Sequence, residues 1–120
     1  MMSIEQHLIE PDITVVQVQG KITAGHHSFE LAAKVDELLQ AGVGRIIFDL
    51  GDVTYLDSTG LGIIVTYGGK LKKSGGEMRI SGARGPVATT LTLCKISEII
   101  PMYATLAEAT ASFGFAAGAA

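Results

Sequence analysis

The sequence predicts a single-domain α/β sandwich, with a mixed, mostly parallel sheet of about four to five strands, about four helices and an antiparallel first strand. Three observations indicate this fold. Two runs rich in β-branched and other apolar residues open the chain, and a Pro-Asp pair between them is typical of an antiparallel hairpin. Short apolar runs then alternate with segments of helical periodicity, as in βαβ units. The 120 residues, of which 48% are hydrophobic and 18% charged, suffice for one domain with its own core.

The first half of the chain is predicted to form the hairpin, a helix and a buried strand. The hairpin occupies residues 3–19, and Gly20 is expected to end its second strand. A helix is predicted over residues 28–41, because four apolar residues recur on one helical face: Leu31, Val35, Leu38 and Leu39. The nearly continuous apolar run at residues 45–50 predicts a strand covered on both faces.

The second half is predicted to continue this alternation. A helix over residues 59–73 carries the apolar stripe Leu61, Ile64, Val65 and Leu71. A strand over residues 77–81 and a helix from Pro86 to about Cys94 follow. A brief strand at residues 99–102 precedes a last helix, whose start has the spacing of a capping box in Thr105 and Glu108.

Domain organisation and composition exclude several classes of protein. Residues 1–113 are expected to form the domain, and the Gly/Ala-rich residues 114–120 a frayed tail. The N-terminus lacks the pattern of a secretory signal, and no apolar run is long enough to insert in a membrane, so we expect a cytoplasmic protein. The single Cys94, expected to be a buried helical thiol, excludes an internal disulfide and a cysteine-rich metal site. We expect no cofactor and no metal.

The charge distribution is uneven along the chain. The net charge of −3 gives no reason for direct nucleic acid binding. Residues 1–69 hold nine acidic and three basic residues, whereas residues 70–95 hold six basic residues and one acidic residue. The basic segment could be a partner surface, but Lys70, Lys72 and Lys73 are better explained as solvating and electrostatically favouring the end of a helix.

The most informative segment is residues 52–62, which lie between a predicted strand and a predicted helix. Ser58 is expected at or next to the helix N-terminus, where free backbone N–H groups and the positive end of the helix dipole meet. Either Ser58 or Asp57 could therefore cap the helix. A phosphate on Ser58 would also be well accommodated, because helix N-termini bind anions.

Two glycines in the first turn of this helix favour a functional interpretation. Gly60 and Gly62 each lower helix propensity by about 1 kcal/mol relative to alanine. Glycine also removes side-chain bulk, so that another chain can approach closely. We expect a low, exposed docking point beside Ser58, with an apolar edge formed by Leu61, Ile63 and Ile64.

Residues 54–62, TYLDSTGLG, closely resemble the signature of STAS domains, and more narrowly of bacterial anti-sigma factor antagonists. The similarity extends over nearly the whole chain, including Gly20-Lys21-Ile22, residues 45–50 and residues 100–103. The resemblance implies that Ser58 is phosphorylated by a partner that is both anti-sigma factor and ATP-dependent serine kinase. The unphosphorylated antagonist binds this partner, and a PP2C-type phosphatase restores it.

The resemblance therefore implies a regulatory switch rather than an enzyme. Partner-binding residues are expected around Ser58: Thr23, Asp57, Thr59, Gly60, Leu61, Gly62 and Ile63. One departure from the family is notable, because the common Gly-x-Leu-Asp pattern is replaced here by Gly-Lys-Ile-Thr, which places Thr23 where an acid is usual. The adjacent His26 and His27 could bind a metal or sense pH, but paired histidines without a third ligand usually do neither.

Two other classes of function are disfavoured. A serine hydrolase would require Gly-x-Ser-x-Gly, and Leu56 occupies the first glycine position. Neither the P-loop nor the dinucleotide fingerprint is present. The remaining alternative lies within the same family: a STAS scaffold or adaptor module of a stress-signalling complex or a lipid transporter, which need not be phosphorylated.

Overall fold

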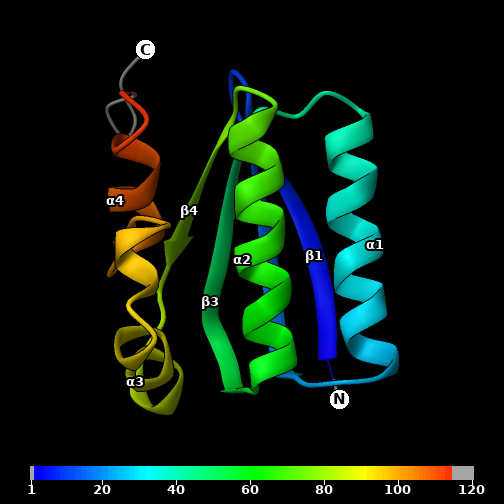
Figure 1. Cartoon of the computed structure of the whole chain (residues 1–120). Coiled ribbons are helices and arrows are strands. Elements are labelled where there is room, and N and C mark those ends of the chain that lie inside the picture. Colours follow the sequence, from blue (N-terminus) through cyan, green and yellow to red (C-terminus); the bar gives the residue numbers. More distant parts are fainter. Residues whose placement is uncertain (1, 115–120) are drawn as a thin grey trace.

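The structure, a computed structural model, describes residues 2–114, apart from the side chains of His26 and His27 (Figure 1). Its five-stranded sheet has the order β1-β2-β3-β4-β5. The first strand is antiparallel to the second, and the remaining pairs are parallel. The predicted fold class is confirmed. The strands are β1 (Met2–Ile9), β2 (Ile13–Ile22), β3 (Arg45–Leu56), β4 (Glu77–Ser81) and β5 (Met102–Tyr103).

Four α-helices connect or follow the strands in the predicted order: α1 (His26–Gln40), α2 (Ser58–Lys73), α3 (Gly85–Leu93) and α4 (Leu106–Ala111). A short 3₁₀-helix, η1 (Ile96–Glu98), was not predicted. Helices α1 and α2 lie side by side against the sheet (Figure 1). No helix within residues 2–114 has the length and apolar character needed to cross a bilayer.

The sheet is buried on both faces because its central strands alternate between two cores. Val16 of β2 and Phe48 of β3 belong to the main core, which α1, α2 and α3 also supply. Val15 and Ile47, their immediate neighbours in the chain, belong to a smaller cluster with Ala109 of α4. This arrangement explains the continuous apolar run that predicted a doubly covered strand.

The two strands nearest the candidate site are longer than predicted. Strand β2 continues through Gly20 to Ile22, and β3 continues beyond Leu50 to Leu56. The two strands pair along this extension, and their register shifts between Gln17 and Gln19 and again between Gly20 and Lys21. Gly20 lies within this irregular part of the pairing, as glycines in strands commonly do. The extension carries the chain directly to the start of α2.

The C-terminal part of the chain differs from the prediction in two places. The predicted strand at 99–102 is displaced to Met102–Tyr103, because Ile100 is buried in the main core beside η1. Cys94 is exposed at the end of α3, so the expectation of a buried thiol is wrong. Of the predicted tail, residues 115–120 lie outside the described part of the chain.

Candidate functional site

Ser58 is the first residue of α2, and its side chain is exposed. Strand β3 ends at the buried Leu56, and Asp57 then adopts the extended conformation of an N-cap residue. No hydrogen bond occupies the Ser58 hydroxyl among the described residues. The hydroxyl is therefore free to react with an approaching group.

Asp57 caps α2, which resolves the question of which residue does so. Its Oδ1 accepts a hydrogen bond from the backbone N–H of Gly60 at 2.8 Å, and its Oδ2 accepts one from the N–H of Ala24 at 3.0 Å. The bond from Gly60 is the largest cause that lowers the pKa of Asp57, with further backbone bonds from Ala24 and Thr59; partial burial opposes them. The carboxylate thus holds the start of α2 against the β2–α1 loop.

Gly60 is buried, so the prediction that it forms part of an exposed docking point is wrong. A Cβ atom there would lie 2.6 Å from Ile22 Cγ2 and 2.8 Å from the carbonyl oxygen of Ile22. The first turn of α2 therefore packs so closely on the end of β2 that only glycine fits. Its role is internal packing.

The other predicted contact residues of this turn differ in exposure. Thr59 and Gly62 are exposed, whereas Leu61 and Ile63 are half-buried and pack against the main core. A Cβ atom on Gly62 would meet nothing within 4 Å. Ile64, the third residue of the predicted apolar edge, is fully buried in the main core, so that part of the prediction is wrong. The edge consists of the half-buried Leu61 and Ile63 alone.

A groove of about 440 Å³ runs between α1 and α2, beside this turn. It is lined by Gly25, Ser28, Phe29, Ala32, Thr59, Gly62, Ile63, Thr66 and Tyr67. Phe29 is 74% exposed, although it is a large apolar residue. The sequence analysis did not identify Phe29, because this residue lies outside the apolar stripe of α1. The one feature that could have indicated it is an aromatic residue on the predicted polar side of the helix.

The sequence now places this arrangement in a family, because the STAS domain family model matches residues 6–109. The chain belongs to the STAS domain family. The predicted resemblance is thereby confirmed.

Two curated relatives resemble this STAS domain in sequence. A Thermotoga maritima protein, provisionally named an anti-sigma factor antagonist, is 34% identical over 74 residues, which is 62% of this chain and 66% of the relative. The anti-sigma F factor antagonist of Paenibacillus polymyxa is 27% identical over 93 residues, which is 76% of this chain and 78% of the relative. The chain thus spans slightly less than two thirds of the first relative.

Solved structures show that the STAS fold extends over nearly the whole chain. An anti-sigma factor antagonist from Mycobacterium paratuberculosis has a TM-score of 0.84 at 24% identity, covering 96% of each chain. The Bacillus cell fate determinant SpoIIAA in its phosphorylated form has a TM-score of 0.73 at 17% identity, covering 92% of this chain and 99% of that one. At these identities the likeness concerns the fold.

Thr23, the departure from the family pattern, lies half-buried in the β2–α1 loop of this STAS domain. The next residue, Ala24, donates the hydrogen bond to Asp57, so the loop is held beside the start of α2. The structure thus brings Thr23 into the neighbourhood of Ser58. His26 and His27 begin α1, but their side chains lie outside the described part; the described residues contain no cluster of metal ligands.

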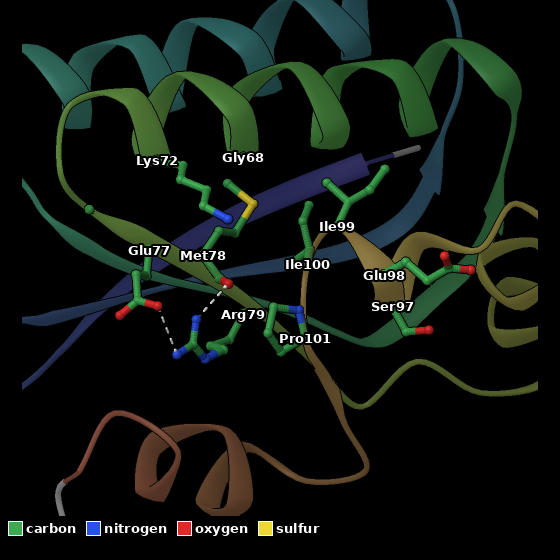
Figure 2. Close-up of a pocket in the computed structure, with 11 residues that line it drawn as sticks. Gly68, Lys72, Glu77, Met78, Arg79, Ser97, Glu98, Ile99, Ile100 and Pro101 are labelled. Atoms are coloured by element: carbon green, nitrogen blue, oxygen red, sulfur yellow. Dashed lines mark hydrogen bonds and ion pairs between the residues drawn. The ribbon is translucent and has the colours of Figure 1, made fainter.

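A second hollow of this STAS domain, about 240 Å³ in volume, lies between α2, the start of β4 and residues 97–101 (Figure 2). Charged side chains surround it, including Lys72 and Arg79. Arg79 donates hydrogen bonds to Glu77 Oε1 at 3.2 Å and to Ser112 Oγ at 3.0 Å. Arg79 therefore connects β4 to the end of α4, and its guanidinium is already engaged within the domain. This favours a structural role for the hollow over a binding site.

Proposed function

We propose that this STAS domain is an anti-sigma factor antagonist, which binds an anti-sigma factor/serine kinase when Ser58 is unphosphorylated and is released when Ser58 is phosphorylated. The observation that carries the proposal is an exposed serine hydroxyl at the first position of α2, with the capping role taken by the neighbouring Asp57. The names of both curated relatives support it. A PP2C-type phosphatase would reverse the modification.

The position of Ser58 suits a switch that alters binding without altering the fold. A phosphate adds about 1.5 to 2 negative charges and three strong hydrogen-bond acceptors. The N-terminus of α2 favours this charge, whereas the ionised Asp57 beside it disfavours it. At an interface the phosphate would have to lose its hydration, and a hundredfold loss of affinity requires only about 2.7 kcal/mol.

The proposed contact surface surrounds Ser58 on two sides. The exposed Thr59 and Gly62 and the half-buried Asp57 belong to the start of α2, and the half-buried Thr23 belongs to the adjoining loop. Leu61 and Ile63 would contribute the half-exposed parts of their side chains. Gly60 would contribute indirectly, by letting α2 pack on Ile22. With Thr23 in place of an acid, this loop offers the partner a hydroxyl rather than a carboxylate.

Phosphorylation by the cognate anti-sigma factor/serine kinase tests the proposal. The protein, Ser58→Ala and Thr59→Ala are each incubated with the kinase and ATP, and the modified residue is located by tandem mass spectrometry. We expect phosphate on Ser58 in the wild type and in Thr59→Ala, the control for a neighbouring exposed hydroxyl. Ser58→Ala should stay unmodified and still bind the kinase.

Normal modification of Ser58→Ala would contradict the proposal, since the phosphate would then lie elsewhere. Binding that is equal for the unmodified and modified protein would also contradict it, and would favour the scaffold or adaptor function. The two readouts therefore separate the site of modification from its consequence.

A further inference from the structure

The groove between α1 and α2 carries no charged side chain among its lining residues. Its walls are apolar or bear hydroxyl groups, including Ala32, Ile63 and Thr66. The hollow of Figure 2, in contrast, is bordered by Lys72, Glu77, Arg79 and Glu98. The chemistry of the α1–α2 groove therefore suits an uncharged, apolar occupant.

Gly62 faces this groove, and the fold of the chain gives no reason for a glycine at this position. The residue is helical and exposed, and a Cβ atom on it would meet nothing within 4 Å. Gly60 and Gly68 differ, because a Cβ atom on either would approach Ile22 or Ile100 to within 2.8 Å. An alanine at position 62 would favour the helix by about 1 kcal/mol. The bare backbone at Gly62 instead leaves the groove open.

Phe29 marks the rim of the groove as a surface for a protein rather than for a small molecule. Its side chain is 74% exposed, so the groove is not closed on this side. A small-molecule pocket typically buries about 70–90% of its ligand. Large aromatic side chains beside an open groove are instead typical of protein–protein interfaces, where a few such residues contribute most of the binding energy. Thr59 also lines the groove and directly follows Ser58, so one protein can cover both.

We infer that the α1–α2 groove receives an apolar side chain of the protein that binds at Ser58, and that Gly62 keeps the groove open for it. This inference rests on the proposed function, since the occupant belongs to the anti-sigma factor/serine kinase. The contact has two parts: one at Ser58, which responds to phosphorylation, and an apolar one in the groove, which adds affinity. Phe29 lies against the bound side chain.

A matched pair of glycine substitutions tests the inference. Gly62→Leu fills the groove, whereas Gly69→Leu places the same side chain on the same helix, also with nothing within 4 Å of its Cβ, outside the lining residues. Both are made in the Ser58→Ala background, so that phosphorylation does not intervene. Affinity for the kinase that modifies Ser58 is measured by isothermal titration calorimetry.

We expect Gly62→Leu to weaken binding at least about tenfold and Gly69→Leu by less than about twofold; tenfold corresponds to about 1.4 kcal/mol. Both variants should unfold at or above the parent temperature, because leucine favours a helix over glycine. Phe29→Ala, which truncates an exposed side chain, should weaken binding by a similar factor without unfolding the domain.

Equal affinity of Gly62→Leu and Gly69→Leu would overturn the inference while leaving phosphorylation of Ser58 intact. An apolar small molecule retained by the wild type but not by Gly62→Leu in native mass spectrometry would overturn it in favour of a ligand pocket. Failure of the Ser58→Ala parent to bind the kinase would contradict the proposed function itself, and the inference with it.

Discussion

Asp57 and Ala24 join two segments that are 33 residues apart, through a hydrogen bond of 3.0 Å from the Ala24 N–H to Asp57 Oδ2. The same carboxylate caps α2 through Gly60. One side chain therefore fixes both the helix that begins at Ser58 and the loop that carries Thr23. Asp57 therefore helps to set the relative position of these two surfaces, together with the close packing of Gly60 on Ile22.

Removing this carboxylate should destabilise the protein. Asp57→Ala loses the cap of α2 and the bond from Ala24, and capping residues contribute about 0.5–2 kcal/mol to the free energy of unfolding. Urea denaturation followed by circular dichroism measures the difference. Asp52→Ala, which replaces an exposed carboxylate without a cap bond, is the control. Equal losses in both variants would contradict this role.

The contribution of Asp57 should also depend on pH. The pKa of Asp57 in the folded protein is lowered from 3.8, mainly by the bond from Gly60. A lowered folded-state pKa stabilises the protein above the unfolded-state pKa, and this stabilisation is lost as pH falls through the folded-state value. The stability difference between wild type and Asp57→Ala should therefore narrow below about pH 4. A constant difference between neutral and strongly acidic pH would refute this.

Two alanine substitutions in the first turn of α2 should have opposite effects on stability. Gly60→Ala brings a Cβ atom within 2.8 Å of the Ile22 carbonyl oxygen, and such overpacking costs about 1–3 kcal/mol. Gly62→Ala meets nothing within 4 Å and should stabilise the helix by up to about 1 kcal/mol. Thermal unfolding of both variants checks the prediction, which fails if their midpoints shift in the same direction.

A side-chain hydrogen bond between α1 and α2 should also contribute to stability. Tyr67 donates its hydroxyl to Asp36 Oδ2 at 2.8 Å, and burial, followed by the bond and charge of Asp36, raises the pKa of Tyr67. Tyr67→Phe should lower the free energy of unfolding by about 1.5–3 kcal/mol, the range for a hydrogen bond to a charged group. Tyr55→Phe, at a 49% exposed residue, should change it little. Similar losses in both would contradict the prediction.

A negative charge at position 58 should separate binding from folding. Ser58→Glu places the charge at the N-terminus of α2, where it is favourable by about 0.3–1 kcal/mol, so the domain should stay folded. Affinity for the kinase should fall at least about tenfold relative to Ser58→Ala, because the charge loses hydration at the interface. Ser58→Gln controls for the size of the side chain. If Gln weakens binding as much as Glu, bulk rather than charge is responsible.

The sequence predicted the order of the strands and α-helices from periodicity for most of them, from Pro86 for α3 and from the capping box for α4, although β5 is displaced. Helix α1 is an example: Leu31, Val35 and Leu38 of the predicted stripe are buried, and Leu39 is half-buried and packs against the main core. Thr105 likewise accepts the predicted capping bond from the N–H of Glu108 at 3.1 Å. Local patterns suffice where a segment buries one face and satisfies its own ends.

The remaining features depend on neighbours that are distant in the sequence. Gly60 looked like a surface glycine because Ile22, which excludes a side chain there, is 38 positions earlier in the numbering. Asp57 could not be distinguished from Ser58 as the cap until Ala24 was placed beside it. The exposed Phe29 became informative only when α2 formed the opposite wall of a groove. Contacts between elements, rather than patterns within them, define the site.

The close packing of Gly60 on Ile22 also has a consequence for the rate at which phosphorylation would change partner binding. Because the space between the first turn of α2 and β2 is too small even for a Cβ atom, the start of α2 has no room to slide along β2. A phosphate on Ser58 would then change the electrostatic character of an almost rigid surface. Signalling through such a surface needs no refolding step, so its timing would be set by the enzymes that add and remove the phosphate.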